Sequence, residues 1–396
     1  MPGIANAFAR TCGSLAVAAC VLQASGTAQA PQTGFDLAAL NRIDEVVADA
    51  IKAKQLPGAV VVVGRGDQVA FRKAYGQRAI QPSPEPMTLD TIFDMASLTK
   101  VVATTPSVMM LVEQGRIRLT DPVASFIPEF AKYGKDRITV RDLMTHMSGL
   151  RPDVDLGDPW VGSQEAIKLA TEETLTQPPG RRFVYSDINY FLLAEIVSRV
   201  TKQPFAEFVQ QRLFKPLGMR DTMFTPPAAL LPRIAPTQPC TPYGWPCEGP
   251  DMKMLRGVVH DPTARRMGGV AGHAGLFSTA ADLTIYARML LGGGAVGATR
   301  VLAPLTVARM TSPATPAGEP NVRGLGWDLD SSYSANRGEL LPLGSFGHTG
   351  FTGTSIWVDP GTRVFVIFLS NRVHPDGRGD VTPLRARVAT IVGSAL

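Results

Sequence analysis

The amino-acid sequence predicts an α/β (α+β) fold in which strands from both ends of the chain form one antiparallel sheet flanked by helices. Strand-like apolar runs lie between residues 58 and 74 and again in the C-terminal part of the chain. The middle of the chain instead shows the apolar spacing that is typical of helices, which predicts an all-helical lobe. We place the α/β lobe at about residues 35–95 and 305–396 and the helical lobe at about 96–304.

Short patterns predict the N-terminal elements. Residues 36–55 carry apolar side chains at helical spacing and predict the first helix. The runs 58–63 and 69–74 are strand-like, and the turn sequence Gly64-Arg65-Gly66-Asp67 joins them. Two strands separated by such a turn predict a β-hairpin.

Helical periodicity characterises the middle of the chain, and strand patterns return after it. The expected helices of the middle are 101–114, 140–147, 163–175, 188–213 and 280–291. Near the C-terminus, 354–358 and 363–369 are strand-like and are separated by the turn Asp359-Pro360-Gly361. A closing helix is expected over about 382–392.

The composition is that of a globular protein with a large core. The chain has 396 residues, of which 45% are hydrophobic and 18% charged, and a formal net charge of +5. Lysine and arginine neither cluster in runs nor alternate with aromatic residues, so we expect no nucleic-acid partner. No pattern in the sequence indicates an oligomeric state.

Residues 1–30 have the pattern of a signal peptide, so we expect a periplasmic or secreted protein with a mature domain over 31–396. A basic residue precedes the apolar stretch 15–22, and Ala28-Gln29-Ala30 fits a cleavage site. The alternative is a lipoprotein, because Val17-Ala18-Ala19-Cys20 resembles a weak lipoprotein box. Contact with a membrane is then expected only through a lipidated Cys20.

Export also determines how the remaining cysteines are interpreted. Cys240 and Cys247 flank a turn-rich hexapeptide. A single pair in an oxidising compartment most simply forms a local disulfide. The alternative is a pair of metal ligands, but no histidine or further cysteine lies nearby in the sequence. We therefore expect a disulfide and no metal site.

Ser97 and Lys100 form a Ser-x-x-Lys pattern at the start of an expected helix. Residues three apart on a helix share a face, and a partly desolvated lysine can have a lowered pKa and accept the serine proton. The backbone N–H of a serine that opens a helix is free to bind an oxyanion. A surface helix with an unrelated serine and lysine would show the same pattern, so other motifs must decide.

Two further motifs are compatible with the same chemistry. Tyr185-Ser186-Asp187 precedes a helical segment, and a phenol near an ammonium group can act as a general base. The structural alternative is a half-buried tyrosine followed by a helix cap at Asp187. The segment Gly347–Gly353 allows close approach of the backbone to a substrate, and one of its N–H groups could be a second oxyanion donor. Its structural alternative is a glycine-rich bend with a solvated His348.

Together, in this order and spacing, the three motifs resemble those of the serine β-lactamase and penicillin-binding protein superfamily, specifically its class C branch. That branch carries Ser-x-x-Lys, Tyr-x-Asn and Lys-Thr-Gly and includes esterases, carboxypeptidases and amidases. The resemblance covers essentially the whole mature chain and implies a β-lactamase/transpeptidase-like fold. Further segments look like the same branch, namely Asp142–Leu150 and then His260-Asp261-Pro262 with Gly268–Ser278. The second of these stretches particularly resembles low-molecular-mass penicillin-binding proteins of Gram-negative periplasms.

The resemblance implies a role for each matching residue. Ser97 would be the acylated nucleophile and Lys100 the amine beside it, with Tyr185 as general base and acid. Which of Lys100 and Tyr185 accepts the proton stays open, because such clusters titrate together. The backbone N–H groups of Ser97 and Phe351 would form the oxyanion hole. The substrate-binding positions implied are Asp187, His348, Thr349 and Gly350.

Two departures from the family pattern bear on the substrate. Asp187 stands where the family has asparagine, and an ionised carboxylate cannot donate a hydrogen bond to a substrate carbonyl. His348 stands where the family has lysine, so a fixed positive charge is replaced by a side chain that is mostly neutral at pH 7. Both changes favour esters or peptidoglycan-derived amides and peptides over β-lactams as substrates.

Rival functions follow from the same residues. A penicillin-binding or sensor module would acylate without efficient turnover, and a true class C β-lactamase would hydrolyse antibiotics. An α/β-hydrolase is excluded because no Gly-x-Ser-x-Gly sequence occurs. A metallohydrolase is disfavoured because none of the histidines has zincin spacing. We expect no cofactor.

Overall fold

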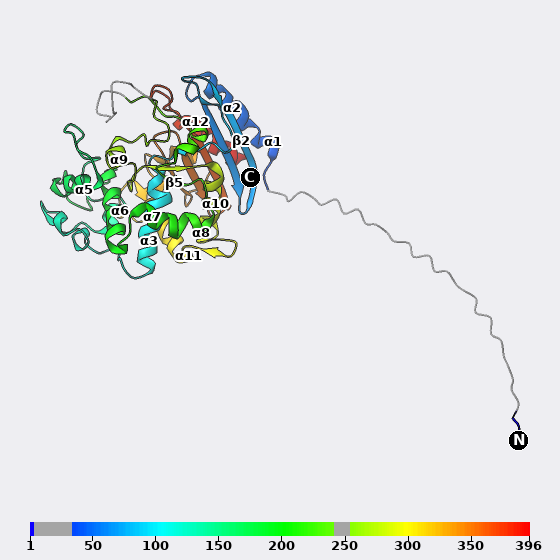
Figure 1. The fold of residues 1–396 in the computed structure, drawn as a ribbon, viewed down its shortest axis with the longest axis horizontal. Coiled ribbons are helices and arrows are strands. Elements are labelled where there is room, and N and C mark those ends of the chain that lie inside the picture. The colour runs from blue at the N-terminus through cyan, green and yellow to red at the C-terminus, as the bar shows by residue number, and fades with distance from the viewer. Residues whose placement is uncertain (4–33, 241–253) are drawn as a thin grey trace. The chain divides into compact units, whose positions relative to one another are not determined.

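The computed structural model describes residues 1–3, 34–240 and 254–396 (Figure 1). The chain divides into two units, Met1–Gln32 and Thr33–Leu396. The predicted cleavage site, Cys20 and Cys247 lie outside the described residues, so the signal peptide and the disulfide stay predictions. All elements given below belong to the second unit.

The described part of the chain contains an eight-stranded sheet in the order β3-β2-β1-β13-β12-β11-β10-β9, and every neighbouring pair is antiparallel. The N-terminal strand β1 pairs with the C-terminal strand β13, with Ala59 opposite Ser370. The predicted sheet built from both ends of the chain is therefore confirmed. Its strands are β1 (Gly58–Arg65), β2 (Gln68–Ala79), β3 (Glu85–Pro86), β9 (Val322–Arg323), β10 (Asp328–Asp330), β11 (Phe346–Thr349), β12 (Ser355–Asp359) and β13 (Val364–Ser370).

The two faces of this sheet bury different cores, because side chains alternate along a strand. Val60 and Val62 of β1 belong to the large core that includes the helical middle of the chain. Val61 and Val63 belong to a second core, which packs against helices from the two ends of the chain. These helices are α1 (Leu37–Leu40), α2 (Arg42–Lys52) and α12 (Thr382–Ser394) (Figure 1).

The middle of the chain is mainly helical. It includes a π-helical segment, η1 (Lys100–Thr104), that continues into α3 (Thr105–Glu113), and a second one, η4 (Gln210–Phe214). Helix α10 contacts β1, β12 and β13 on the large-core face of the sheet. The α-helices of this part are α3, α4 (Val140–Met144), α5 (Ser163–Glu172), α6 (Asp187–Thr201), α7 (Phe205–Val209), α8 (Lys215–Leu217), α9 (Pro262–Arg266), α10 (Ala280–Leu291) and α11 (Pro304–Met310).

Two small sheets also occur in the described residues besides the eight-stranded one, and the sequence pattern does not predict them. Strand β6 (Leu276–Ser278) lies between β4 (Phe93–Asp94) and β5 (Met223–Phe224), and β7 (Ala295–Val296) pairs with β8 (Thr299–Arg300). Strands of two or three residues are too short to show a periodicity of two. The β4–β6 pair matters for the site, because β4 leads directly to Ser97.

The long helix expected over 188–213 is interrupted. Helix α6 ends before Lys202, whose φ of 58° is left-handed, and α7 begins after Pro204. Proline lacks a backbone N–H and disfavours a helical conformation in the residue before it, so the helix cannot continue through this point.

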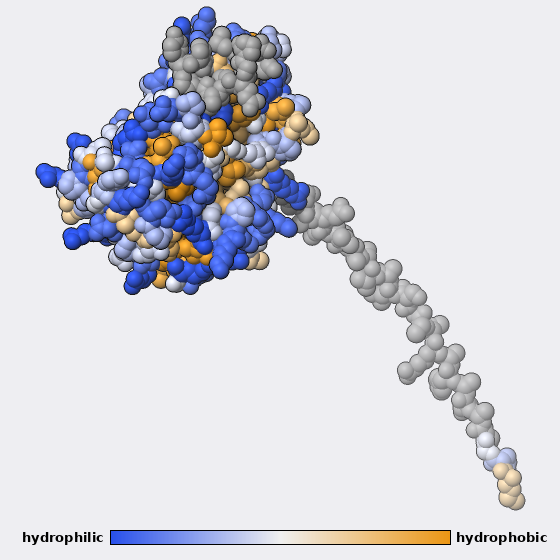
Figure 2. Space-filling view, turned by 60° about the vertical axis from the view of Figure 1, so that its left-hand side comes forward, coloured by the Kyte–Doolittle hydropathy of each residue, from blue (hydrophilic) through white to orange (hydrophobic). Residues whose placement is uncertain are grey.

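The surface shows no obvious concentration of apolar side chains on the face drawn in Figure 2, where hydrophilic residues dominate and hydrophobic ones form small groups. Within the described ranges, no helix combines the length and apolar character needed to cross a bilayer.

Candidate active site

Ser97 lies in a sharp bend between β4 and the helix that follows. The preceding Ala96 has a φ of 44°, a left-handed conformation that costs energy for a residue with a side chain. The carboxylate of Asp94 stabilises this bend, because it accepts hydrogen bonds from the N–H of Ala96 (2.8 Å) and the N–H of His260 (2.6 Å). Strained backbone of this kind is found often at functional sites.

Lys100 is completely buried behind Ser97, and three oxygens surround its ammonium group. Nζ lies 2.6 Å from Oδ1 of Asp187 and donates hydrogen bonds to Oγ of Ser97 (3.1 Å) and the carbonyl of His273 (3.2 Å). Burial acts to lower the pKa of Lys100, but the charge of Asp187 and the neighbouring Tyr185 outweigh it and raise the pKa above its ordinary value. Lys100 is thus an ammonium at neutral pH, and the expectation of a lowered lysine pKa is wrong.

Tyr185 stands just before α6 and is held by aromatic neighbours. Its ring stacks on His146 with centroids 4.4 Å apart and on Tyr333 with centroids 5.3 Å apart. Nζ of Lys100 lies 4.8 Å from the centroid of the Tyr185 ring. His146 is neutral, because burial and the charges of Arg323 and Lys100 hold its pKa well below the ordinary value.

The turn after β11 is fastened to the bend that carries Ser97. Oγ1 of Thr352 donates to the carbonyl of Asp94 (2.7 Å), and Oγ1 of Thr354 donates to the carbonyl of Met95 (3.1 Å). Gly350 permits this approach, since a Cβ there would lie 2.4 Å from the Met95 carbonyl oxygen. The end of β11 is therefore fixed relative to the residue before Ala96.

Two backbone N–H groups near this turn are available to a ligand. Among the described residues, neither the N–H of Ser97 nor that of Phe351 donates a hydrogen bond. These are the two groups that the resemblance to the family predicts as the oxyanion hole.

A pocket of about 170 Å³ opens over Ser97. It brings together Ser97 and Tyr185 with Thr349 at the end of β11 and Phe351 in the turn that follows, whereas Lys100 and Asp187 do not line it. Sequence reasoning missed three of the lining residues: Arg323, Asp328 and Tyr333. The complete lining is Ser97, Tyr185, Arg323, Asp328, Tyr333, His348, Thr349 and Phe351.

Arg323 supplies the positive charge of this pocket. Its side chain is 1% exposed, Nη2 donates to the carbonyl of Gly326 (3.1 Å), and Nη1 lies 3.4 Å from Oδ1 of Asp328. His348 is neutral, because burial and the charges of Arg323 and Lys100 hold its pKa well below the ordinary value. The only sequence signal for Arg323 is its place in the mostly apolar segment 322–329.

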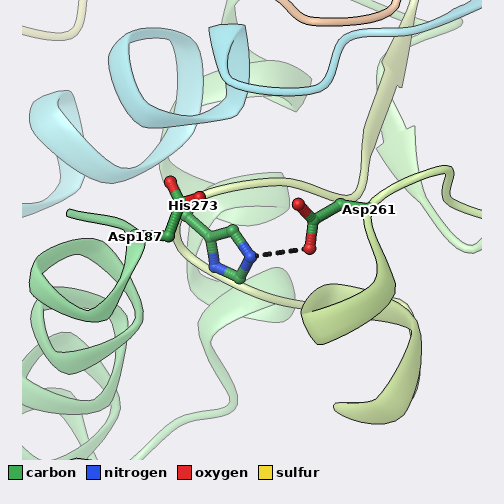
Figure 3. Close-up of side chains that lie close together, drawn as sticks. All are labelled: Asp187, Asp261 and His273. Carbon is green, nitrogen blue, oxygen red and sulfur yellow. Dashed lines mark hydrogen bonds and ion pairs between the residues drawn. The ribbon is translucent and has the colours of Figure 1, made fainter. Parts of the chain in front are cut away.

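Asp187, Asp261 and His273 lie close together (Figure 3), and Lys100 contacts Asp187 and the backbone of His273. One carboxylate oxygen of each aspartate and one ring nitrogen of His273 all lie within 4.8 Å of one another, a spacing at which a metal ion could be held. Nε2 of His273 is instead paired with Oδ1 of Asp261 at 2.9 Å, and Asp187 is paired with Lys100. Ion pairs between side chains therefore account for the cluster without a metal.

The comparison with known protein families decides the family of this chain. Residues 43–390 match the model of the family described as "Beta-lactamase". The chain belongs to the beta-lactamase family. It is also 31% identical, over 88% of its length and 86% of the relative's, to a Salmonella agona (strain SL483) protein named "Putative D-alanyl-D-alanine carboxypeptidase".

Solved structures show that the fold is that of this beta-lactamase family. EstCE1, described as a hydrolase with promiscuous acyltransferase activity, is similar with a TM-score of 0.71 and 22% identity, over 90% of this chain and 99% of that one. A class C beta-lactamase from Rhodobacter sphaeroides is similar with a TM-score of 0.67 and 20% identity, over 89% of this chain and 98% of that one. The protein is therefore a hydrolase of the beta-lactamase family with a β-lactamase-like fold.

The geometry gives a physical account of both departures from the family's motifs. At position 187, a carboxylate provides the counter-charge that keeps the buried Lys100 protonated. At position 348, a lysine would add a third cation close to Arg323 and Lys100, both of which already oppose protonation of the histidine there. In this pocket the positive charge therefore comes from Arg323 and not from residue 348.

Proposed function

We propose that this protein is an exported serine hydrolase that forms an acyl-enzyme on Ser97. Its substrates would be esters or peptidoglycan-derived peptides and amides, and its β-lactamase activity would be weak or absent. The observation that carries the proposal is the hydrogen bond from the buried Lys100 ammonium to Oγ of Ser97, at the base of a pocket that Tyr185 also lines.

The charges favour Tyr185 over Lys100 as the proton acceptor. Lys100 is already protonated and has no free lone pair to accept the proton of Ser97. In the proposed mechanism, Tyr185 as phenolate takes this proton while Oγ attacks the substrate carbonyl, and Lys100 balances the phenolate charge. The resulting oxyanion accepts hydrogen bonds from the N–H groups of Ser97 and Phe351.

Collapse of the intermediate breaks the bond to the leaving group. Tyr185 returns its proton to the departing alkoxide or amine, which leaves an ester between Ser97 and the acyl group. Water then attacks this ester with Tyr185 as base, and Ser97 regains its proton as the acid product leaves. Each cycle consumes one water and one ester or amide bond.

The presence of Arg323 in the pocket favours substrates that carry a carboxylate. A guanidinium in a buried pocket binds a carboxylate through charge-assisted hydrogen bonds, which are stronger than neutral ones. The relative from Salmonella agona is named for a substrate that ends in D-alanine, and such a peptide has a free carboxylate. We therefore propose D-alanyl-D-alanine peptides as the leading substrate class and neutral esters as a second class.

Three substrates distinguish this function from its rivals. We expect steady release of product from a D-alanyl-D-alanine peptide and from p-nitrophenyl acetate, and slow or no hydrolysis of benzylpenicillin. A burst of product followed by no turnover, with acylated protein in the mass spectrum, would indicate a penicillin-binding or sensor module instead. Hydrolysis of benzylpenicillin that exceeds both other activities would indicate a true class C β-lactamase.

A further inference from the structure

Two sequence segments outside the three catalytic motifs meet directly behind the catalytic lysine. The segment His260-Asp261-Pro262 supplies Asp261, and the segment Gly272-His273 supplies the imidazole that pairs with it at 2.9 Å (Figure 3). The carbonyl of His273 also accepts a hydrogen bond from Nζ of Lys100 (3.2 Å). His273 is thus tied to Lys100 through its backbone and to Asp261 through its ring.

The backbone around His273 is held in one place. Oγ1 of Thr104, one turn after Lys100, donates to the carbonyl of Gly272 (2.6 Å). A Cβ on Gly272 would lie 2.0 Å from the carbonyl oxygen of Tyr190, so only glycine fits between η1 and α6. Since α6 also begins with Asp187, the position of His273 is fixed relative to both Lys100 and Asp187.

The charges in this cluster balance only when His273 is protonated. Burial acts to lower the pKa of His273, but the carboxylates of Asp261 and Asp187 outweigh it and raise the pKa. The pKa of Asp261 is lowered to about 2, because His273 outweighs the effect of burial. An ammonium and an imidazolium then face two carboxylates.

Asp153 completes the set of charged groups around His273. Burial and the negative charge of Asp187 raise the pKa of Asp153 to about 7, and its Oδ2 accepts a hydrogen bond from Oγ1 of Thr263 (2.6 Å). The groups facing His273 are therefore Lys100 from η1, Asp187 from α6, Asp261 at the start of α9, and Asp153 from the loop before α5.

We propose that the His273–Asp261 ion pair is a positioning element of the active site, which keeps the carboxylate of Asp187 aimed at Lys100. Without the imidazolium, two carboxylates would lie within 4.8 Å of each other, with the ammonium of Lys100 as their remaining counter-charge. Asp187 would then turn away from Lys100, and Lys100 would lose the carboxylate that lies 2.6 Å from its ammonium group. This inference rests on the proposed function of Ser97 and Lys100.

The experiment uses the variants His273→Gln and Asp261→Asn, singly and together, in the full mature chain. Asp261 accepts the N–H of Ala264 at 2.8 Å, and the amide oxygen introduced by Asp261→Asn can still accept it, so the start of α9 is kept. We expect kcat for p-nitrophenyl acetate to fall about ten- to a hundredfold in His273→Gln, since small displacements of catalytic groups have effects of this size. KM should stay unchanged, and the double variant should be no worse than His273→Gln alone.

The pH profile separates a positioning role from a structural one. As pH rises through the raised pKa of His273, the imidazolium is lost, so kcat of the unmodified protein should fall on the alkaline side. In Asp261→Asn the histidine loses its main counter-charge, so this fall should move to lower pH. In His273→Gln this alkaline fall in kcat should be absent.

Matched controls are buried residues with similar contacts elsewhere. His374→Gln removes an imidazole bonded to Ile80 N–H (3.0 Å) and the Thr237 carbonyl (2.9 Å), and Asp282→Asn removes a carboxylate bonded to Thr222 (2.8 Å). Both should keep the kcat and pH profile of the unmodified protein. Unchanged kcat and pH profile in His273→Gln and Asp261→Asn would overturn the inference, as would losses that only follow a lower melting temperature. Acylation of a Ser97→Ala variant would instead overturn the proposed function.

Discussion

Replacement of Arg323 by glutamine tests whether this residue binds the carboxylate of a substrate. Glutamine keeps a donor for the carbonyl of Gly326 but removes the positive charge from the pocket. A charge-assisted hydrogen bond contributes about 1.5–3 kcal/mol, which corresponds to about 10- to 150-fold in kcat/KM. Because Asp328 lies 3.4 Å from the guanidinium and already offsets part of its charge, we expect a loss near tenfold.

The assay compares two substrates on the same protein sample. One is an N-acylated D-alanyl-D-alanine peptide, and the other is the same peptide with a C-terminal amide in place of the carboxylate. Removal of one member of a buried ion pair can cost about 3–5 kcal/mol of stability, but a smaller folded fraction lowers both rates equally. The ratio of the two kcat/KM values therefore reports carboxylate recognition alone.

The ratio should fall about tenfold in Arg323→Gln. Arg337→Gln is the control, because Arg337 is ion-paired to Asp330 at 3.1 Å and does not line the pocket. An unchanged ratio in Arg323→Gln, or an equal change in the control, would refute the assignment of Arg323 to the carboxylate.

The remaining predictions concern the catalytic residues, the family departures and the cysteines. Lys100→Ala and Tyr185→Phe should each lower the acylation rate by about 10² to 10⁴, and stopped-flow measurements on the double variant should show less than the product of the two effects. Asp187→Asn alone should lower kcat on every substrate, because Lys100 loses its counter-charge. When Asp187→Asn is combined with His348→Lys, the ratio of kcat/KM for benzylpenicillin to kcat/KM for p-nitrophenyl acetate should rise about tenfold or more. An unchanged ratio would contradict the recognition argument. Non-reducing alkylation of the exported protein should modify neither Cys240 nor Cys247, and two alkylated thiols would contradict the disulfide.

Local patterns in the sequence predict much of the fold. The apolar runs of β1 and β13 indicate buried strands, and α10 begins and ends where its periodicity does, at Ala280 and Leu291. The interruption after α6 is also readable in principle, since Pro204 lies inside the expected helix. Strands such as β4 escape prediction, because two residues form a strand only when a distant segment pairs with them.

The candidate site is predicted only where residues lie in motifs. Ser97, Tyr185 and Phe351 reach one pocket from three motifs that are far apart in the chain. The charge of Lys100 could not be predicted, because its pKa depends on whether burial or the carboxylate of Asp187 has the larger effect. Arg323 belongs to no motif, and its role follows from the packing of β9 beside β10 at the edge of the sheet.

The central claim is that Ser97 carries the acyl group, and peptide mapping tests it most directly. The protein is mixed with p-nitrophenyl acetate, quenched in acid within the first turnovers, digested and analysed by mass spectrometry. We expect an acetyl group on the peptide that contains Ser97, and no acetylated peptide from Ser97→Ala, whose circular dichroism should match that of the unmodified protein. An acetyl group on any other residue, or continued acylation and turnover in folded Ser97→Ala, would contradict the account.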